Sequence, residues 1–315
     1  MTRPLGLATR EAYGLALAEL GRERPEIVVL DGDLSKSTMT KYFAKEFPDR
    51  FFNMGIAEAN MVGVAAGLAR CGKVPFVSSF AAFLMCKGFD QMRVSVAYAG
   101  LNVKFVGSHG GISIGEDGVS QQSVEDVALA RALPGFAVFV PADEHATRAV
   151  VRAAADHPGP CYVRVGRPKA PVVYPDGCDF RVGRAIQLRD GGDVTLVANG
   201  LMVAAALDAA EALAREGVEA RVLDMASVKP LDEDALEAAA RETGGIVVAE
   251  EHLLAGGLGS AVAMSVARRR PVPMGFVGLD DTYAESGRPE ELMAKYGLTA
   301  ERIAEEARRV LALAR

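Results

Sequence analysis

Hydrophobic and polar positions alternate along the chain between two recurring patterns. Short runs of β-branched and other apolar residues predict buried strands. They cover residues 26–30, 74–80, 102–108, 136–141 and 161–165, and later 194–199, 219–224, 245–250 and 274–279. Between them, apolar residues three and four positions apart predict amphipathic helices over 10–20, 57–70, 147–155, 203–216 and 302–314. Apolar strands joined by helices are typical of an α/β fold with mostly parallel sheets flanked by helices.

The alternation breaks once, within residues 166–192, where Pro168, Pro171 and Pro175 interrupt it. Proline restricts the chain to turns and extended segments, so this stretch is typical of a connection. We therefore predict two domains, at residues 1–168 and 192–315, joined by a linker at residues 169–191. Both have ordinary sizes for units with their own cores.

Composition and charge exclude several classes of protein. Of the 315 residues, 50% are hydrophobic and 24% are charged, which is typical of a folded chain. The net charge of −6 argues against a nucleic-acid partner. The longest nearly apolar stretch, 194–207, is too short to cross a membrane, and the first residues lack a signal-peptide pattern. Four scattered cysteines without a CxxC pair predict a reduced, cytoplasmic protein without a zinc site or disulfides.

The most informative single residue is Glu58. A helix that begins near Ala57 places Glu58 on the apolar face, together with Met61, Val62 and Ala65. A carboxylate at such a place is either paired or used for proton chemistry. Alternatively, it interacts with the helix dipole in the first turn. The segment by itself favours neither interpretation.

Two aromatic residues, Phe80 and Phe83, follow the strand at 74–80. They could form a flat apolar platform for a ring, although their spacing alone favours a core pair.

Polar residues leave the first strand at residues 31–38, where Asp33 and Ser37 occur. The hydroxyl and amide groups of this segment suit an oxyanion or a phosphate. Equally, a serine here could simply cap a helix.

A glycine-rich loop at residues 107–118 holds His109 and Asp117. Loops at the carboxyl ends of parallel strands are where α/β proteins place their sites, and glycines let the backbone approach a ligand closely. The glycine-rich and acidic surroundings of His109 favour a functional role for this residue over a structural one.

Taken in order, these segments resemble the C-terminal part of a transketolase, a thiamine-diphosphate enzyme that moves a two-carbon ketol unit between sugar phosphates. The resemblance spans essentially the whole chain. Its motifs lie at residues 8–14, 30–33, 56–58, 79–83, 108–110, 114–118, 141–143, 256–259 and 286–289. It implies that the first domain is a pyrimidine-binding domain of the thiamine-diphosphate-binding fold and that the second is the family's C-terminal domain.

The resemblance also implies roles at the cofactor. Glu58 would hydrogen-bond the aminopyrimidine ring and promote its imino tautomer. Phe80 and Phe83 would stack on that ring, which reverses the expectation of a core pair. Asp33 would lie near the thiazolium ring.

A second group of residues would bind the sugar. By resemblance, His109 and Asp117 hold its hydroxyl groups, and His109 joins Glu58 as a catalytic residue. Gln121 stands where many transketolases have a histidine, so it can orient groups by hydrogen bonding but cannot shuttle a proton. The implied ligands of the sugar phosphate are Arg10, Ser37 and Arg167.

The family's diphosphate-binding domain, with its GDG…N magnesium motif, has no match in this sequence. Since the sequence starts at Met1 just before the matching region, we expect the C-terminal subunit of a split transketolase. A separate N-terminal subunit would then hold the cofactor's diphosphate and Mg²⁺ or another divalent ion. The homodimer of fused relatives predicts an α2β2 heterotetramer, and the default substrates are sugar phosphates of the pentose phosphate pathway.

Two other interpretations remain at this point. One is the β subunit of a 2-oxo acid dehydrogenase decarboxylase, against which the paired Arg10 and Arg167 argue, because a 2-oxo acid carries no distal phosphate. The other is an orphan domain that binds without catalysing, which the retention of Glu58, Phe83 and His109 together disfavours. His252, outside these motifs, is interpreted as structural or interfacial.

Overall fold

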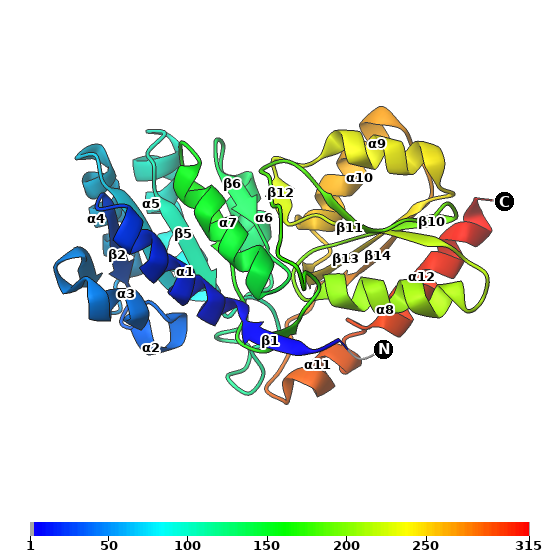
Figure 1. Cartoon of the computed structure of the whole chain (residues 1–315), viewed down its shortest axis with the longest axis horizontal. Helices are drawn as coiled ribbons and strands as arrows, with labels where there is room; N and C mark the ends of the chain where they lie inside the picture. Colours follow the sequence, from blue (N-terminus) through cyan, green and yellow to red (C-terminus); the bar gives the residue numbers. More distant parts are fainter. Residues whose placement is uncertain (1–2, 315) are drawn as a thin grey trace.

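A computed structural model describes residues 3–314, which form two α/β lobes side by side (Figure 1). The first lobe is built on a seven-stranded sheet that is parallel apart from one edge strand. In spatial order its strands are β12 (Ser227–Lys229), β6 (Ala137–Phe139), β7 (Cys161–Arg164), β5 (Lys104–Ser108), β4 (Val74–Phe80), β2 (Ile27–Asp31) and β3 (Phe51–Asn53).

Helices cover both faces of this sheet, because its central strands are apolar on both sides. One face packs against α1 (Thr9–Glu23), α3 (Lys41–Glu46) and α7 (Glu144–Asp156). The other packs against α4 (Glu58–Arg70), α5 (Ala81–Gln91) and α6 (Asp126–Ala132). A short helix, α2 (Ser35–Thr38), follows β2, and a π-helical turn, η2 (Met92–Ala97), extends α5.

The second lobe is built on a five-stranded sheet. Its order is β14 (Met274–Leu279), β13 (Ile246–Leu253), β10 (Val194–Ala198), β11 (Ala220–Asp224) and β9 (Ile186–Arg189), with only β9 antiparallel. Successive residues of β10 face opposite sides. Val194 and Leu196 pack with α8 (Met202–Ala214) and α12 (Ala300–Leu313), whereas Val197 packs with α9 (Glu233–Glu242) and α10 (Leu258–Arg269). One further helix is α11 (Pro289–Lys295).

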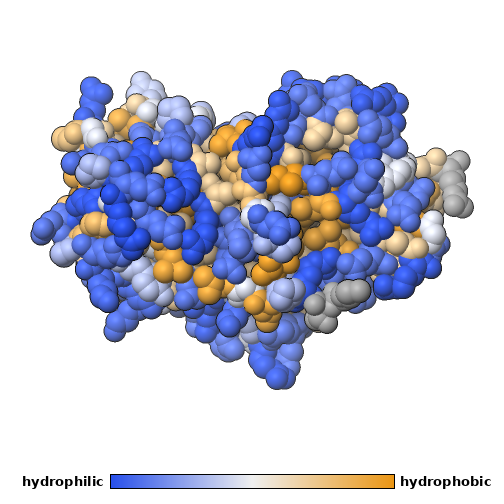
Figure 2. Space-filling view, in the orientation of Figure 1, coloured by the Kyte–Doolittle hydropathy of each residue, from blue (hydrophilic) through white to orange (hydrophobic). Residues whose placement is uncertain are grey.

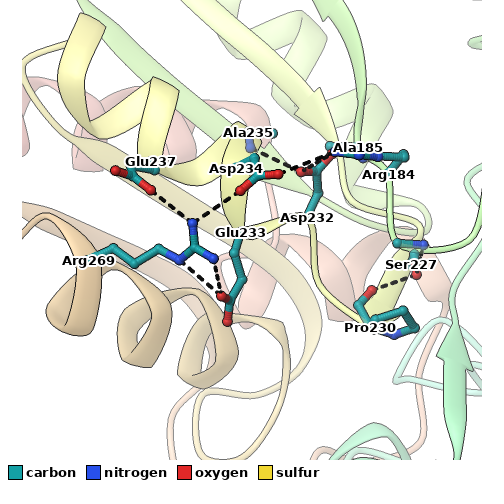
Figure 3. A network of polar contacts seen from close by, with 11 residues as sticks. Arg184, Ala185, Ser227, Pro230, Asp232, Glu233, Asp234, Ala235, Glu237 and Arg269 are labelled. Atoms are coloured by element: carbon teal, nitrogen blue, oxygen red, sulfur yellow. Dashed lines mark hydrogen bonds and ion pairs between the residues drawn. The ribbon is translucent and has the colours of Figure 1, made fainter.

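Strand β12 joins the two lobes, because it follows β11 in the chain but pairs with β6 of the first sheet. A separate two-stranded sheet pairs β1 (Leu5–Ala8) with β8 (Lys169–Pro171). Within the second lobe, Asp232 caps α9 by accepting from Ala235 N–H and also accepts from Ala185 N–H at 2.9 Å, while Arg269 of α10 pairs with three acidic residues of α9 (Figure 3). The segment expected as a linker, 169–191, thus contributes one strand to each of two sheets.

Apolar side chains gather between the lobes on the face that Figure 2 shows, whereas polar ones cover most of the remainder. A cleft of about 480 Å³ is lined by Leu5, Pro168, Pro171, Leu201 and Met293, among other residues.

The α/β class and the mostly parallel sheets are confirmed, and the expected strands and helices appear with shifts of a few residues. The strands that the hydrophobic pattern missed are β1, β3, β8, β9 and β12, each of three or four residues. A run of three or four residues is too short to show the alternation of apolar and polar positions that identifies a strand. Within residues 3–314, no helix combines the length and apolar character that crossing a bilayer requires.

Candidate functional site

Glu58 is the first residue of α4 and is 2% exposed, beside Met61 and Val62 on the buried face. Its Oε1 accepts a hydrogen bond of 3.0 Å from Ser79 Oγ, and the Lys87 ammonium lies 3.8 Å from Oε2. The apolar-face placement is therefore confirmed. Ser79 of β4 and Lys87 of α5 both contact this carboxylate, so tertiary contacts as well as the helix dipole stabilise it.

The two aromatic residues lie next to this carboxylate. Phe80 ends β4 and is buried, whereas Phe83, in the first turn of α5, is half-buried. Their rings stack with centroids 5.5 Å apart and planes inclined by 18°. Lys87 Nζ lies 4.3 Å from the centroid of Phe83, so the open side of the pair is bordered by the same lysine that contacts Glu58.

An acidic turn follows β2 beside Glu58. Asp31 is buried and accepts hydrogen bonds from Leu34 N–H at 2.6 Å and from the hydroxyls of Thr38 and Thr40. Burial raises the pKa of Asp31 despite these donors. The next residue but one, Asp33, is exposed, has φ +65° and accepts from Asn53 Nδ2 at 2.8 Å. Asp31 thus stabilises the turn through its hydrogen bonds, and Asp33 lies at the surface of the turn.

His109 is held between the aromatic pair and a cation. Its Nδ1 donates to Ser108 Oγ at 2.6 Å, and its Nε2 accepts from Arg10 Nη1 at 3.1 Å, a tautomer that follows from these partners. Burial, then Arg10 and Arg167, lower the pKa of His109 to about 3. At neutral pH the imidazole is therefore uncharged.

Arg10 extends from α1 to the turn after β2. Besides His109, its Nη1 reaches the Ser37 carbonyl at 2.9 Å, whereas its Nε is buried and has no hydrogen-bond partner among residues 3–314. Burial and the nearby Arg167 lower the pKa of Arg10. Two guanidinium groups that repel each other and a donor without a partner are typical of a place where an anion binds. Ser37 contributes its carbonyl here, and no serine side chain caps α2.

Arg167 lies just beyond β7 and holds the glycine-rich loop. Its Nη1 donates to the Ile114 carbonyl and to Glu116 Oε2, the latter at 3.1 Å, and lies 3.9 Å from Asp117 Oδ2. Gln121, three residues after this loop, accepts from Ser120 Oγ at 2.7 Å. The structure thus brings the sequence-predicted residues Arg10, His109, Asp117 and Arg167 to one region, with Asp117 bound electrostatically to Arg167.

Family models match both halves of the chain. The model described as "Transketolase, pyrimidine binding domain" matches residues 6–172, and that described as "Transketolase, C-terminal domain" matches residues 183–303. The chain belongs to the transketolase family.

Relatives of this transketolase-family chain include separate subunits and longer proteins. It is 44% identical over 301 residues to the 6-deoxy-6-sulfo-D-fructose transketolase subunit SqwH of a Clostridium species, covering 96% of this chain and 94% of that protein. It is 42% identical over 306 residues to Homo sapiens transketolase, covering 96% of this chain but 49% of that protein. A solved structure described as a split gene transketolase, inactive beta4 tetramer, is 52% identical, has a TM-score of 0.92 and covers 98% of this chain and all (100%) of that one.

Transketolases use thiamine diphosphate, and the side chains around Glu58 are chemically suited to the ring end of that cofactor. They combine a buried carboxylate with the half-buried ring of Phe83. The backbone at Gly32 runs so close that a Cβ there would lie 3.2 Å from Ser79 Oγ and 3.6 Å from Glu58 Oε1. For the diphosphate end, residues 3–314 contain no group of three His, Cys, Asp or Glu side chains arranged to hold a metal ion.

Four side chains in this region were not assigned a site role from the sequence. They are Ser79 and Lys87 beside Glu58, Ser108 beside His109, and Glu116 beside Arg167. Ser79, Ser108 and Glu116 each lie one residue from a predicted site residue, which is a usable signal. Lys87 is not adjacent in sequence to a predicted site residue. It lies over Phe83 because the two residues are four positions apart on α5, a helix that the hydrophobic pattern did not predict.

Proposed function

We propose that this chain is the C-terminal subunit of a split transketolase that transfers a two-carbon ketol unit between ketose and aldose phosphates. The observation that carries the proposal is the buried Glu58 carboxylate near the stacked Phe80–Phe83 pair, with the imidazole of His109 stacked on Phe80. A carboxylate, an aromatic face and a neutral imidazole together suit a protonatable heteroaromatic ring and its substrate.

In this proposal the cofactor supplies the nucleophilic carbon that accepts the ketol unit. Glu58 holds and exchanges a proton with the aminopyrimidine ring, and Ser79 fixes the orientation of its carboxylate. Phe80 and Phe83 position the ring, and Asp33 faces its thiazolium end. These residues act by orientation and proton transfer, the two contributions that a protein makes to cofactor chemistry.

The sugar end falls to the second group of residues. His109, as an acceptor at Nε2, Asp117 and Gln121 bind hydroxyl groups, while Arg10 and Arg167 bind the phosphate at the edge near Ser37. A sugar phosphate would take Arg167 from its present partner Glu116, 3.1 Å away, and would meet the free Nε of Arg10. Charge-assisted contacts of this kind bind anions strongly.

A partner subunit completes the site in this proposal. Apolar side chains are exposed on the segment that leads into α4 and on α4 itself: Ile56 is 78% exposed, Phe52 39% and Val64 37%. Exposed apolar surface next to the Glu58 side-chain cluster fits a covering protein surface. We propose an α2β2 heterotetramer, formed in the cytoplasm, in which the N-terminal subunit holds the diphosphate and the divalent ion.

The test is reconstitution with a candidate N-terminal subunit that carries the GDG…N motif. The mixture, with thiamine diphosphate and Mg²⁺, should convert xylulose 5-phosphate and ribose 5-phosphate in a coupled assay. Because one relative is named for a sulfonated sugar, 6-deoxy-6-sulfo-D-fructose belongs in the same panel. Transfer from none of these donors would contradict the proposed function.

The isolated chain provides a second test. Calorimetry with thiamine diphosphate and Mg²⁺ should show weak binding, since the ring pocket holds one end of the cofactor, and the isolated chain should have no transfer activity. Tight, saturable binding without a partner would show that this chain needs no second subunit for the cofactor.

A further inference from the structure

The glycine-rich loop of the first domain lies against the second domain on two sides. Ser113 N–H donates to Glu251 Oε1 at 2.6 Å, and Gln122 Nε2 donates to the Glu285 carbonyl at 3.0 Å. Gly115 packs so close to Pro289 that a Cβ there would lie 3.0 Å from its ring. The loop that carries His109 and Asp117 therefore takes its shape from contacts with β13 and with the segment before α11.

Glu251 is buried, with an exposed fraction of 6%. Its own position is fixed by the first domain: Arg164 Nη1 donates to its carbonyl at 2.8 Å, and Arg164 Nη2 donates to the Ser123 carbonyl at 2.9 Å. The guanidinium is in turn paired with Asp126 at 3.1 Å. Arg164 therefore clamps β13 and the end of the loop to the same strand of the first sheet.

The loop backbone fits around the Glu251 carboxylate at Gly111. This glycine has φ +87°, its N–H donates to the Ser123 carbonyl at 2.7 Å, and a Cβ there would lie 2.1 Å from Glu251 Oε1. No side chain can occupy that space, so the carboxylate sits directly on the loop backbone. A buried carboxylate that accepts from an N–H two residues further on, at Ser113, holds this geometry firmly.

His252, the next residue of β13, adds a parallel contact. It is fully buried, its Nδ1 donates to the Leu253 carbonyl at 2.7 Å, and its Nε2 accepts from Ala128 N–H of α6 at 3.3 Å. Its interpretation as a structural or interfacial residue is confirmed. His252 contacts α6 rather than the loop, so it serves as a comparison for a domain contact that does not touch residues 109–118.

We propose that Glu251 of the second domain is a positioning residue for substrate binding, which acts by holding the loop so that His109 and Asp117 face the sugar. This rests on the proposed function, since that function assigns His109 and Asp117 to the sugar. It also gives the second domain a part in substrate binding, although Ser79 and Lys87, which contact Glu58, both belong to the first domain.

The competing interpretation is that Glu251 only holds the two domains together through its charge. Two conservative variants distinguish this interpretation from loop positioning. Glu251→Asp keeps the charge near Arg164 but withdraws the carboxylate from Ser113 N–H by about one methylene. Glu251→Gln removes the charge but keeps an oxygen that can reach Ser113 N–H. If the charge alone matters, Glu251→Gln should disturb the loop and substrate binding more than Glu251→Asp does. If loop positioning matters, Glu251→Asp should disturb them more.

Hydrogen exchange on the full chain tests the structural step. Positioning predicts faster deuterium uptake over residues 110–118 in Glu251→Asp, near-wild-type uptake in Glu251→Gln, and no change over α4. Equal uptake by wild type and Glu251→Asp in that loop would overturn the inference. This arm needs no activity, so it remains decisive if the proposed function fails.

Kinetics of the chain reconstituted with its partner test the functional step. Glu251→Asp should raise KM for ribose 5-phosphate by about tenfold, the effect of one lost charged hydrogen bond, with kcat within about threefold of wild type. Glu251→Gln should restore KM to within about threefold of wild type. A fall in kcat with unchanged KM, or equal losses in both variants, would overturn it, whereas an inactive wild type would instead overturn the proposed function.

Discussion

The imidazole of His109 stacks on the ring of Phe80, with centroids 3.8 Å apart and planes inclined by 26°. Phe80 stacks on Phe83 near Glu58, and His109 opens the loop that carries Asp117, so this contact joins the proposed cofactor and sugar regions. Burial keeps the imidazole neutral, and its φ of +60° turns the chain sharply from β5 into the loop. A shift of the loop would therefore be felt at both regions.

Replacing Glu58 by Gln should lower the turnover of the reconstituted enzyme by roughly 100-fold, the scale of a lost acid–base group. Glutamine keeps the shape and can still accept from Ser79, but it cannot exchange a proton with the ring. Glu46→Gln, an exposed glutamate of α3 that pairs with Arg22, is the matched control and should stay within about twofold of wild type. Turnover of the Glu58 variant within a few-fold of wild type at saturating cofactor would rule out the proton role.

Arg167→Ala should lower kcat/KM for xylulose 5-phosphate by about tenfold to a hundredfold, because a charge-assisted hydrogen bond to the phosphate is lost. Hydroxypyruvate, which has no phosphate, should be affected little. Since Arg167 also holds the Ile114 carbonyl, a purely structural role would reduce the use of both donors alike. The control is Arg181→Ala, whose side chain is 72% exposed and pairs only with its neighbour Asp179 among the described residues.

Acid should destabilise the chain partly through His109. The folded-state pKa of His109 is lowered to about 3, against 6.5 for the free side chain, so between these pH values only the unfolded state binds the proton. Above about pH 6.5, His109 does not affect the pH dependence of the free energy of unfolding. Below that pH, it lowers the free energy of unfolding by about 1.4 kcal/mol for each pH unit. His109→Gln should therefore lose less stability than wild type between pH 7 and pH 4.5, as measured by urea unfolding. Parallel losses in the two proteins would show that His109 is protonated in the folded state.

Replacing Ile56 by Glu should weaken the complex with the N-terminal subunit at least about tenfold, because a charge would be buried at an apolar contact. The fold itself should survive, since Ile56 is 78% exposed in this chain. Leu313→Glu, at the exposed end of α12 in the other lobe, is the control and should leave the Kd unchanged. Sedimentation of the mixed subunits measures both, and unimpaired assembly of the Ile56 variant would place the partner elsewhere.

Local pattern was enough for the framework of the fold. Strands such as β4 and β10 follow directly from apolar runs, because burial on both faces leaves a nearly continuous apolar segment. The burial of Glu58 follows from helical spacing alone, since residues 58, 61, 62 and 65 must share a face. The short strand β12 could not be predicted, because its three residues are defined by pairing with β6, a strand nearly 90 residues earlier in the chain.

The sequence by itself determined the α/β class, the family resemblance and the residues proposed for the site. Only the tertiary structure decided which of them touch: Ser79 and Lys87 at Glu58, Phe80 at His109, Glu116 at Arg167, and Glu251 at the loop. The physical reason is that periodicity encodes which face of an element is buried, whereas contacts between elements depend on how sheets and loops pack across more than 100 residues of chain, as between Ser113 and Glu251.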